Sequence, residues 1–315
     1  MNVTPVYNVP GRQQGVALIT VMLVVALATT AAVAMASRQQ VDIRRTENTL
    51  YAGQAWMYMM GVEDWAKQFL AQDVKDNKID HYGEDWATRL PPLPVEGGKV
   101  QGTLDDLQGR FNINSLAQSG DAGKSARQRF TRLLNVLGLN PDLANIAADW
   151  VDADQEPRFP AGAEDGFYLG QDPSYRSANR PMTSVSEMLL LKGMTYDDYE
   201  KLLPFITTLP VKTPININTA SAQVLACLAD DLPEKELEAL VKKRADKPYN
   251  KVEDFLAERI FAGKKIPLDG LSVSSDYFML QSTVDVGHVH RTQISLFERD
   301  NKGRVVTLQR SGAGL

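Results

Sequence analysis

The sequence lacks the residues and motifs on which most enzymes depend. It has a single cysteine, Cys227, and three histidines in 315 residues, so an internal disulfide is excluded. It contains no Gly-x-Ser-x-Gly, His-Glu-x-x-His, phosphate-loop or dinucleotide-binding pattern. Acidic pairs occur, but pairs alone do not define a two-carboxylate glycosidase. We therefore predict no catalytic residues, and we expect a protein that is not an enzyme.

An excess of positive charge is also missing. The chain has 34 basic and 39 acidic residues and a net charge of −5, whereas nucleic-acid-binding domains are more often basic. One alternative stays open, because residues 214–256 resemble the helix-hairpin-helix region of membrane-anchored DNA-uptake receptors. The phosphate contacts would then be Lys242, Lys243, Arg244 and Lys247. The turn at 229–234 is acidic and has no glycine, so we do not expect nucleic acid as a partner.

Charge is absent from one long segment near the N-terminus. Residues 16–36 are 21 uncharged residues, which as a helix would span a bilayer core of about 30 Å. The segment could be a secretory signal peptide cut after Ala36, a plain signal anchor, or the retained helix behind a prepilin-type leader. It exceeds the ~7–15 apolar residues of a signal peptide. Residues 11–15, followed directly by the apolar run, resemble a prepilin leader.

That resemblance implies removal of residues 1–15 by a prepilin peptidase, which would cleave after Gly15 and leave an N-methylated Val16. It also exposes a second absence. Major pilins carry a glutamate at the fifth mature position, which here is Thr20. An unpaired carboxylate inside a membrane costs roughly 2.5–3.5 kcal/mol on insertion scales. In a filament, such a carboxylate needs a partner in the neighbouring subunit. A subunit with no neighbour above it would therefore gain nothing from keeping the glutamate.

The remaining pattern predicts an α+β fold with four parts. Residues 37–70 contain no proline, so we expect the apolar helix to continue as a spine over 16–70. Residues 91–98 are rich in proline and glycine and predict a break. Short strands follow at 99–103 and 110–113, and alternating residues from 276 onward predict further strands, including a hairpin around 300–303. We therefore expect a pilin-like domain at 71–113 and 276–315, with an α-helical domain inserted at 114–275.

A weak internal repeat lies within the predicted insertion. Residues 111–116, Phe-Asn-Ile-Asn-Ser-Leu, resemble residues 215–220, Ile-Asn-Ile-Asn-Thr-Ala. Each copy precedes a helical stretch, and short polar side chains such as those of Asn114 and Asn218 can cap a helix start. We interpret both copies as structural entry points to helices.

The segment 149–172 is strongly acidic, with seven carboxylates and one basic residue, Arg158. Carboxylates at alternate positions can converge when the chain turns, and oxygen ligands in this number suit Ca²⁺. The spacing is not that of an EF-hand, because Pro157 stands where that loop needs glycine. From spacing alone, a solvated acidic loop is an equal alternative. The carboxylates in question are Asp149, Asp152, Asp154, Glu156, Glu164, Asp165 and Asp172.

Several of these features together resemble the general secretion pathway protein K family, the K-type minor pseudopilins of type II secretion systems. Trp150-Val151-Asp152-Ala153-Asp154 and Gly162-Ala163-Glu164-Asp165 match its Trp-x-Asp-x-Asp and Gly-Ala-Glu-Asp motifs. The leader, Thr20, the helical insertion and the terminal strands fit as well. The resemblance implies a structural Ca²⁺ ion held by Asp152, Asp154, Glu164 and Asp165, with Glu156 and Asp149 as further candidates.

The resemblance also implies a location and a set of partners. The chain would be a single-pass protein of the bacterial inner membrane with its bulk in the periplasm. It would join I-type and J-type minor pseudopilins at the tip of a filament of major pseudopilin, initiating or capping that filament for protein export across the outer membrane. Its other expected partners are the prepilin peptidase and the inner-membrane assembly platform.

Overall fold

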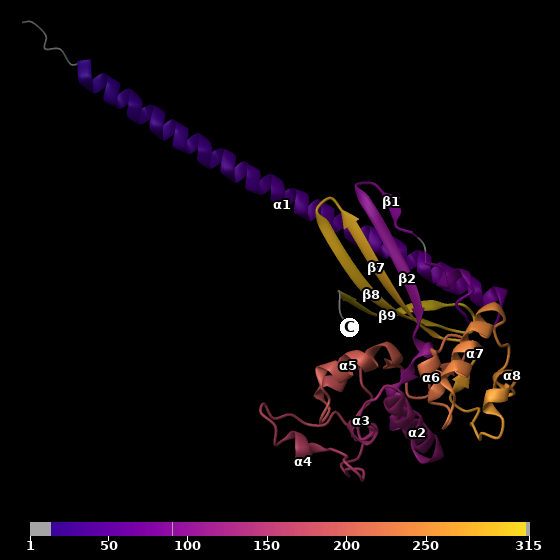
Figure 1. Cartoon of the computed structure of the whole chain (residues 1–315). Helices are drawn as coiled ribbons and strands as arrows, with labels where there is room; N and C mark the ends of the chain where they lie inside the picture. Colours follow the sequence, from indigo (N-terminus) through magenta and orange to yellow (C-terminus); the bar gives the residue numbers. More distant parts are fainter. Residues whose placement is uncertain (1–13, 90, 313–315) are drawn as a thin grey trace, which may run out of the picture. The chain divides into compact units, whose positions relative to one another are not determined.

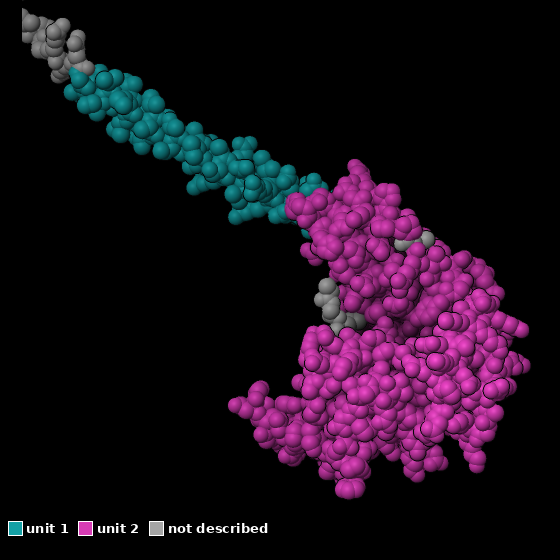
Figure 2. All heavy atoms as spheres, in the orientation of Figure 1, with its two compact units in different colours: residues 1–54 teal, residues 55–315 magenta. Residues whose placement is uncertain are grey.

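The computed structural model describes residues 14–89 and 91–312, and the chain divides into two compact units, residues 1–54 and 55–315 (Figures 1 and 2). Helix α1, Gln14–Asp76, runs through both. In the described part of the chain, α1 is the helix that is long and apolar enough to cross a membrane, so it is compatible with a single-pass anchor. Gly15 and Val16 lie in α1, whereas residues 1–13 of the predicted leader lie outside the described residues.

Within the second unit, five strands form one antiparallel sheet in the order β1-β2-β7-β8-β9. The alternation that predicts strands after residue 276 is confirmed, and β8 and β9 form the expected hairpin. Phe278 on β7 stands opposite Phe297 on β8, and Leu280 on β7 stands opposite Leu104 on β2. The strands are β1 Leu93–Val95, β2 Gly98–Asp106, β7 Tyr277–Val286, β8 Val289–Arg299 and β9 Val305–Gly312.

The part of α1 in this unit packs on the sheet through a small apolar core. Ala66 and Leu70 of α1 share this core with Phe278, Leu280 and Phe297 of the strands. The predicted architecture of a long N-terminal helix on an antiparallel sheet is therefore confirmed. The helix continues to Asp76, beyond the predicted end at residue 70.

A buried carboxylate fixes α1 to the last two strands. Glu63 is 1% exposed, and its oxygens accept hydrogen bonds from Lys67, Ser295, Thr307 and Arg310. Burial alone would raise the pKa of Glu63, but these donors outweigh burial and lower the pKa to about 2. The charge is therefore part of the packing between α1 and the sheet.

The chain leaves the sheet after β2 and returns at β7, and a large, mainly helical region occupies the interval (Figure 1). Its apolar side chains form one continuous core. Two short parallel strand pairs lie inside it: β3, Phe111–Asn112, with β4, Ile206–Thr207, and β5, Ile215–Asn216, with β6, Leu271–Ser272. Its helices are α2 Gly120–Val136, α3 Leu143–Val151, α4 Asp165–Tyr168, α5 Tyr196–Leu202, α6 Ala222–Ala226, α7 Glu234–Asp246 and α8 Val252–Leu256.

Two predictions around the insertion need correction. The predicted strand at 110–113 is β3, Phe111–Asn112, and it pairs with β4, Ile206–Thr207, inside the insertion and not with the main sheet. The side chain of Asp106 accepts a hydrogen bond from the backbone of Gln108, which starts a short helical turn and takes the chain out of the sheet. The predicted break at 91–98 contains strand β1, which turns into β2 through Gly97 at φ 79°.

The two repeat copies have the same construction, but the capping prediction named the wrong asparagine. The side chain of Asn112, not of Asn114, accepts the backbone N–H two residues on, and Asn216 does the same for Asn218. The second asparagine of each copy reaches across the fold. Asn114 bonds both the N–H and the C=O of Met182, and Asn218 bonds the N–H and C=O of Tyr249. These amides hold distant segments together.

Candidate functional site

The acidic loop begins where α3 ends. Helix α3 is almost entirely buried, including Trp150 and Val151, so its C-terminus is fixed against the core. Asp152 is the first residue after the helix, in an extended conformation. The chain then turns through residues 153–163 and re-enters a helix at α4, with Glu164 immediately before it. The two ends of the loop are thus anchored, and carboxylates stand at both ends.

Asp149 fixes the loop from within. It is fully buried, and its oxygens accept hydrogen bonds from the backbone N–H groups of Arg158 (3.1 Å) and Ala163 (2.9 Å) and from the Arg158 guanidinium (2.7 Å). Glycine is required at position 162 beside it, because a Cβ there would overlap the Asp149 Oδ2 atom. Asp149 is therefore occupied by protein donors and shapes the loop from its inner side.

Three of the predicted ligands converge. Asp152, Asp154 and Glu164, which we call the loop trio, each place a carboxylate oxygen within 4.8 Å of the others. Two of these residues have a buried oxygen with no hydrogen-bond partner in the described part of the chain, namely Asp152 Oδ1 and Glu164 Oε1. Orphaned buried oxygens are rare in folded proteins, and an ion is one of the groups that satisfy them.

Electrostatics at the loop trio favour a cation. The pKa of Glu164 is raised to about 7, mainly by burial and further by the negative charges of Asp149, Asp152 and Asp154. A hydrogen bond from Ser177 lowers this pKa but does not outweigh them. Burial likewise raises the pKa of Asp152, although Arg158 contacts both Asp149 and Asp152. One guanidinium thus faces several carboxylates, and a further positive charge would stabilise their ionised forms.

The other predicted ligands lie apart from the loop trio. The side chain of Asp165 accepts hydrogen bonds from the backbone and hydroxyl of Ser177 and pairs with Arg176 at 3.4 Å. Glu156 is exposed, and its backbone N–H donates to Asp154. Asp165 and Glu156 therefore support the loop, while the trio offers the oxygens that could hold a divalent ion. The donors are all oxygens, which suits a hard cation such as Ca²⁺.

Comparison with known proteins connects this site to a family. Family models described as "Type II secretion system (T2SS), protein K" match residues 109–211 and 215–274. The chain is 37% identical over 309 residues to type II secretion system protein K of Pseudomonas aeruginosa, covering 95% of this chain and 92% of that protein. It is 33% identical over 317 residues to the same protein of Klebsiella pneumoniae, covering 96% and 97%.

This chain belongs to the type II secretion system protein K family. A solved structure agrees. The crystal structure of the GspK-GspI-GspJ complex from the type 2 secretion system of enterotoxigenic Escherichia coli superimposes with a TM-score of 0.77 at 29% identity, covering 86% of this chain and all of that chain. Each of the two family matches begins at or just before one repeat copy, and the first match contains the whole acidic loop.

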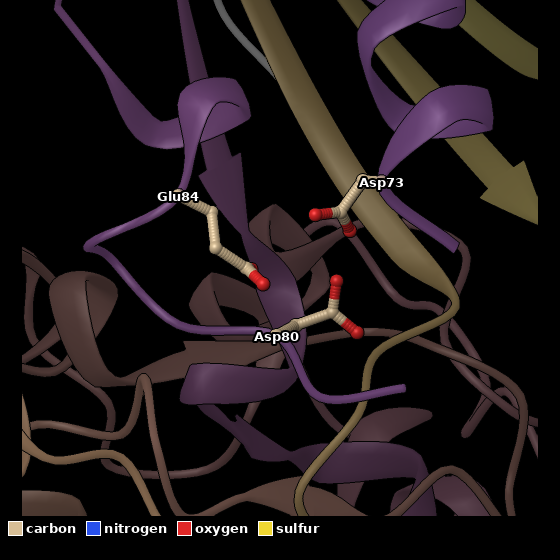
Figure 3. Close-up of side chains that lie close together, drawn as sticks. All are labelled: Asp73, Asp80 and Glu84. Atoms are coloured by element: carbon tan, nitrogen blue, oxygen red, sulfur yellow. The ribbon is translucent and has the colours of Figure 1, made fainter. Parts of the chain in front are cut away.

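A second acidic cluster in this member of the protein K family has no counterpart among the sequence predictions. Asp73 on α1, Asp80 and Glu84 converge in Figure 3, and their ligand atoms also lie within 4.8 Å of one another. Here the protein itself supplies the cation, because Arg299 contacts both Asp73 and Asp80. Glu84 accepts hydrogen bonds from Asn77, from the backbone of His81 and from the Trp86 indole. We call these three carboxylates with Arg299 the Arg299 cluster.

Two of the four residues of the DNA-binding alternative have other partners in this fold. Lys243 pairs with Glu258, and Arg244 is buried and donates to the backbone carbonyls of Ile217 and Ala220. Of the four predicted phosphate contacts, Arg244 is therefore committed inside the fold, and Lys243 is paired at the surface. Lys242 and Lys247 are exposed on α7 and after its end. The family that matches this chain is described as a secretion-system protein, not as a DNA-binding protein.

Proposed function

We propose that this chain is a minor pseudopilin of a type II secretion system, positioned at the tip of the pseudopilus with I-type and J-type partners. Membership of the protein K family carries the proposal, together with the likeness over 86% of the chain to a GspK-GspI-GspJ complex. No reaction is assigned to it, and its contribution to secretion is assembly.

The N-terminal half of α1 is the proposed anchor. Leu18, Ile19 and Leu23 are all more than half exposed, which has a free-energy cost in water and none in a bilayer. We propose that a prepilin peptidase cleaves after Gly15, that Val16 is methylated, and that the residues after the span lie in the periplasm. Thr20 fits a subunit that has no neighbour above it, because its hydroxyl is satisfied by the backbone carbonyls of Val16 and Ala17.

The insertion gives the proposed tip position a physical basis. It places about half of the chain between β2 and β7, which is more volume than a sheet connection needs. A subunit with such a region would hinder addition of another subunit above it. Deleting residues 107–276 and joining β2 to β7 by a short hairpin should therefore change pseudopilus number or length in a secreting strain. Normal secretion and normal filaments in that strain would argue against this role.

We further propose that the loop trio binds one structural Ca²⁺ ion. The two orphaned buried oxygens of Asp152 and Glu164 support this ion most directly. Asp152, Asp154 and Glu164 would hold it, and the ion would supply the positive charge that their mutual repulsion requires. Asp149 and Arg158 would keep the loop shaped around the ion, since their contacts with each other do not involve the trio oxygens that lack partners.

Complex formation tests the assignment at the level of partners. The detergent-solubilised full chain should co-purify with I-type and J-type minor pseudopilins of the same organism as a single species in size-exclusion chromatography with light scattering. A chain with Thr20→Glu serves as a matched control and should associate as the native chain does, because the substitution leaves residues 55–315 unchanged. Failure of the native chain to associate with either partner, under conditions in which those two partners bind each other, would contradict the proposal.

A further inference from the structure

A small pocket lies in the inserted region, away from both acidic clusters. Its volume is about 190 Å³, below the roughly 300–1,000 Å³ of sites that hold drug-sized ligands. It therefore suits one small molecule or one side chain. Its walls come from the start of α2, the segment after β4 and the loop before β6, and include Phe111, Ser125, Arg129, Lys212, Ile215 and Gly270. We call it the Arg129 pocket.

Arg129 is the unusual member of the pocket lining. It is 6% exposed, yet no carboxylate of the described residues is paired with it within 4.0 Å, since none of the ion pairs involves it. Its only hydrogen bonds in the described part of the chain run from Nη2 to the backbone carbonyls of Pro267 (3.3 Å) and Asp269 (3.2 Å). A buried guanidinium with no counter-charge has a large desolvation cost.

Among the residues that the structure describes, the ionisable groups around Arg129 form no ion pair with it, and Asp269 acts on it only at a distance. Cys227 is fully buried, and burial raises the pKa of its thiol to about 12, so it stays neutral. Asp121 and Asp269 also line the pocket, but both are exposed to solvent, and Asp121 pairs with Lys124 at 3.6 Å. Lys212 adds another exposed positive charge to the lining.

A second buried arginine shows what a purely structural role looks like in this fold. Arg244 is 5% exposed and uses Nη1 and Nη2 to hold the carbonyls of Ile217 and Ala220. Arg129 engages carbonyls through Nη2 alone, and its remaining donors are on a side chain that lines a cavity. Ser125 lies one helical turn before Arg129 on the same face of α2 and lines the same cavity.

The backbone is shaped to leave this guanidinium room. Gly270 has φ +79°, and a Cβ there would lie 2.9 Å from Arg129 Nη1. Any side chain at position 270 would therefore crowd that edge of the guanidinium. From these observations, we propose that the Arg129 pocket binds one carboxylate group, held by the Arg129 guanidinium with the Ser125 hydroxyl as a second donor.

The carboxylate could belong to a small organic acid or to an Asp or Glu side chain of another protein. Both have the chemistry that a guanidinium fork recognises. The inference does not depend on the secretion role, because it rests on the pocket alone. Two probes separate the sources: butyrate represents a free acid, and N-acetyl-glutamate amide represents a protein side chain.

Ligand-detected NMR titration of the detergent-solubilised full chain tests the proposal. Butyrate or N-acetyl-glutamate amide should bind saturably, whereas the neutral matches butyramide and N-acetyl-glutamine amide should not. Arg129→Met should raise Kd at least about tenfold, since a charged hydrogen bond is lost. Ala122→Leu, at an exposed lining position on α2, should do the same by filling the pocket mouth while leaving Arg129 in place.

Arg132→Gln is the matched control, because Arg132 lies one turn along α2 and pairs with Asp230 outside the pocket. It should bind both probes as the native chain does. Tighter binding of butyrate would assign the free acid, and tighter binding of the amide would assign a protein side chain. The proposal is overturned if neither probe binds, if Ala122→Leu binds unchanged, or if inorganic phosphate competes more strongly than either carboxylate.

Discussion

The loop trio and the Arg299 cluster contain the same chemical groups and satisfy them differently. Each brings three carboxylates within 4.8 Å. In the Arg299 cluster, a guanidinium bridges Asp73 and Asp80, while amide, indole and backbone donors satisfy Glu84. In the loop trio, Asp152 and Glu164 each retain a buried oxygen with no partner in the described part of the chain. Carboxylates that converge are therefore a weaker sign of a metal site than buried carboxylate oxygens that have no hydrogen-bond partner.

The largest expected effect comes from removing the built-in cation. Arg299→Met would leave the buried Asp80 and the partly buried Asp73 near each other without a counter-charge, and breaking a buried pair in this way costs about 3–5 kcal/mol. We expect a loss of that size in the free energy of unfolding, measured by urea denaturation of the full chain in detergent. Arg304→Ala, at an exposed position five residues on, should change it by less than about 0.5 kcal/mol. Equal effects would contradict the role of the cluster.

Removal of Ca²⁺ should have the next largest effect, and only through the loop trio. Ligand at 100 times Kd stabilises a fold by about 2.7 kcal/mol, so EDTA should lower the Tm and added Ca²⁺ should restore it. Asp152→Asn with Glu164→Gln should abolish this response, whereas Asp73→Asn should leave it intact. A Tm that does not respond to millimolar Ca²⁺ in the native chain would count against the ion. Loss of the Ca²⁺ response in the Asp73→Asn variant would instead indicate that the ion binds at the Arg299 cluster.

A smaller effect should follow from a single methyl group in the acidic loop. Gly162→Ala places a Cβ against Asp149 Oδ2 and the Arg158 backbone, so the loop must shift or strain, at a cost of about 2 kcal/mol. We also expect weaker Ca²⁺ binding, measured by titration calorimetry. Gly166→Ala is the control, because a Cβ at that position would have nothing within 4 Å. Similar behaviour of the two variants would show that Asp149 does not shape the loop.

The smallest effect is the pH dependence of the Arg299 cluster. Burial raises the pKa of Asp73 from 3.8 to about 7, so the folded chain holds this proton more tightly than the unfolded chain. Its contribution to stability is full below about pH 4 and is lost as the pH rises toward 7. Asp73→Asn should flatten the fall in stability between pH 4.5 and 7.5 by up to about 1.4 kcal/mol per pH unit, measured by urea unfolding. Asp76→Asn, an exposed neighbour, should keep the native slope.

Glu63 affects stability in the opposite direction, but its effect falls below the window of pH 4.5–7.5. The pKa of Glu63 is lowered to about 2, so its contribution is present above about pH 4.5 and is lost only as the pH falls below that value. Between pH 4.5 and 7.5 it is constant. An unchanged slope in the Asp73→Asn variant would assign the pH dependence to another buried acid, such as Asp106, whose pKa burial raises to about 6.

Much of the fold follows from the sequence because its signals are local and periodic. The uncharged run and the lack of proline predict α1, and alternation predicts β7, β8 and β9. The capping error and the misplaced strand at 110–113 have another origin. Both depend on segments far away in the chain, since β3 pairs with residues 206–207 and Asn114 bonds Met182. No local pattern specifies those partners.

The candidate site is predictable to a similar extent. Acidic spacing and the Gly-Ala-Glu-Asp motif indicate the loop, but not which carboxylates face one another. Asp149 resembles its neighbours in sequence, and only the fold shows that its oxygens are taken by Arg158 and Ala163. The Arg299 cluster escapes prediction for the same reason. Arg299 lies 219 residues from Asp80 along the chain, and nothing near either residue indicates the pair.

The mature N-terminus tests the central claim most directly. Intact mass and N-terminal sequencing of the protein extracted from membranes should find a chain that begins at Val16 and carries one added methyl group, with the apolar half of α1 retained. Recovery of the protein from the soluble periplasmic fraction, beginning at Ser37, would contradict the proposal that this chain is an anchored pseudopilus subunit.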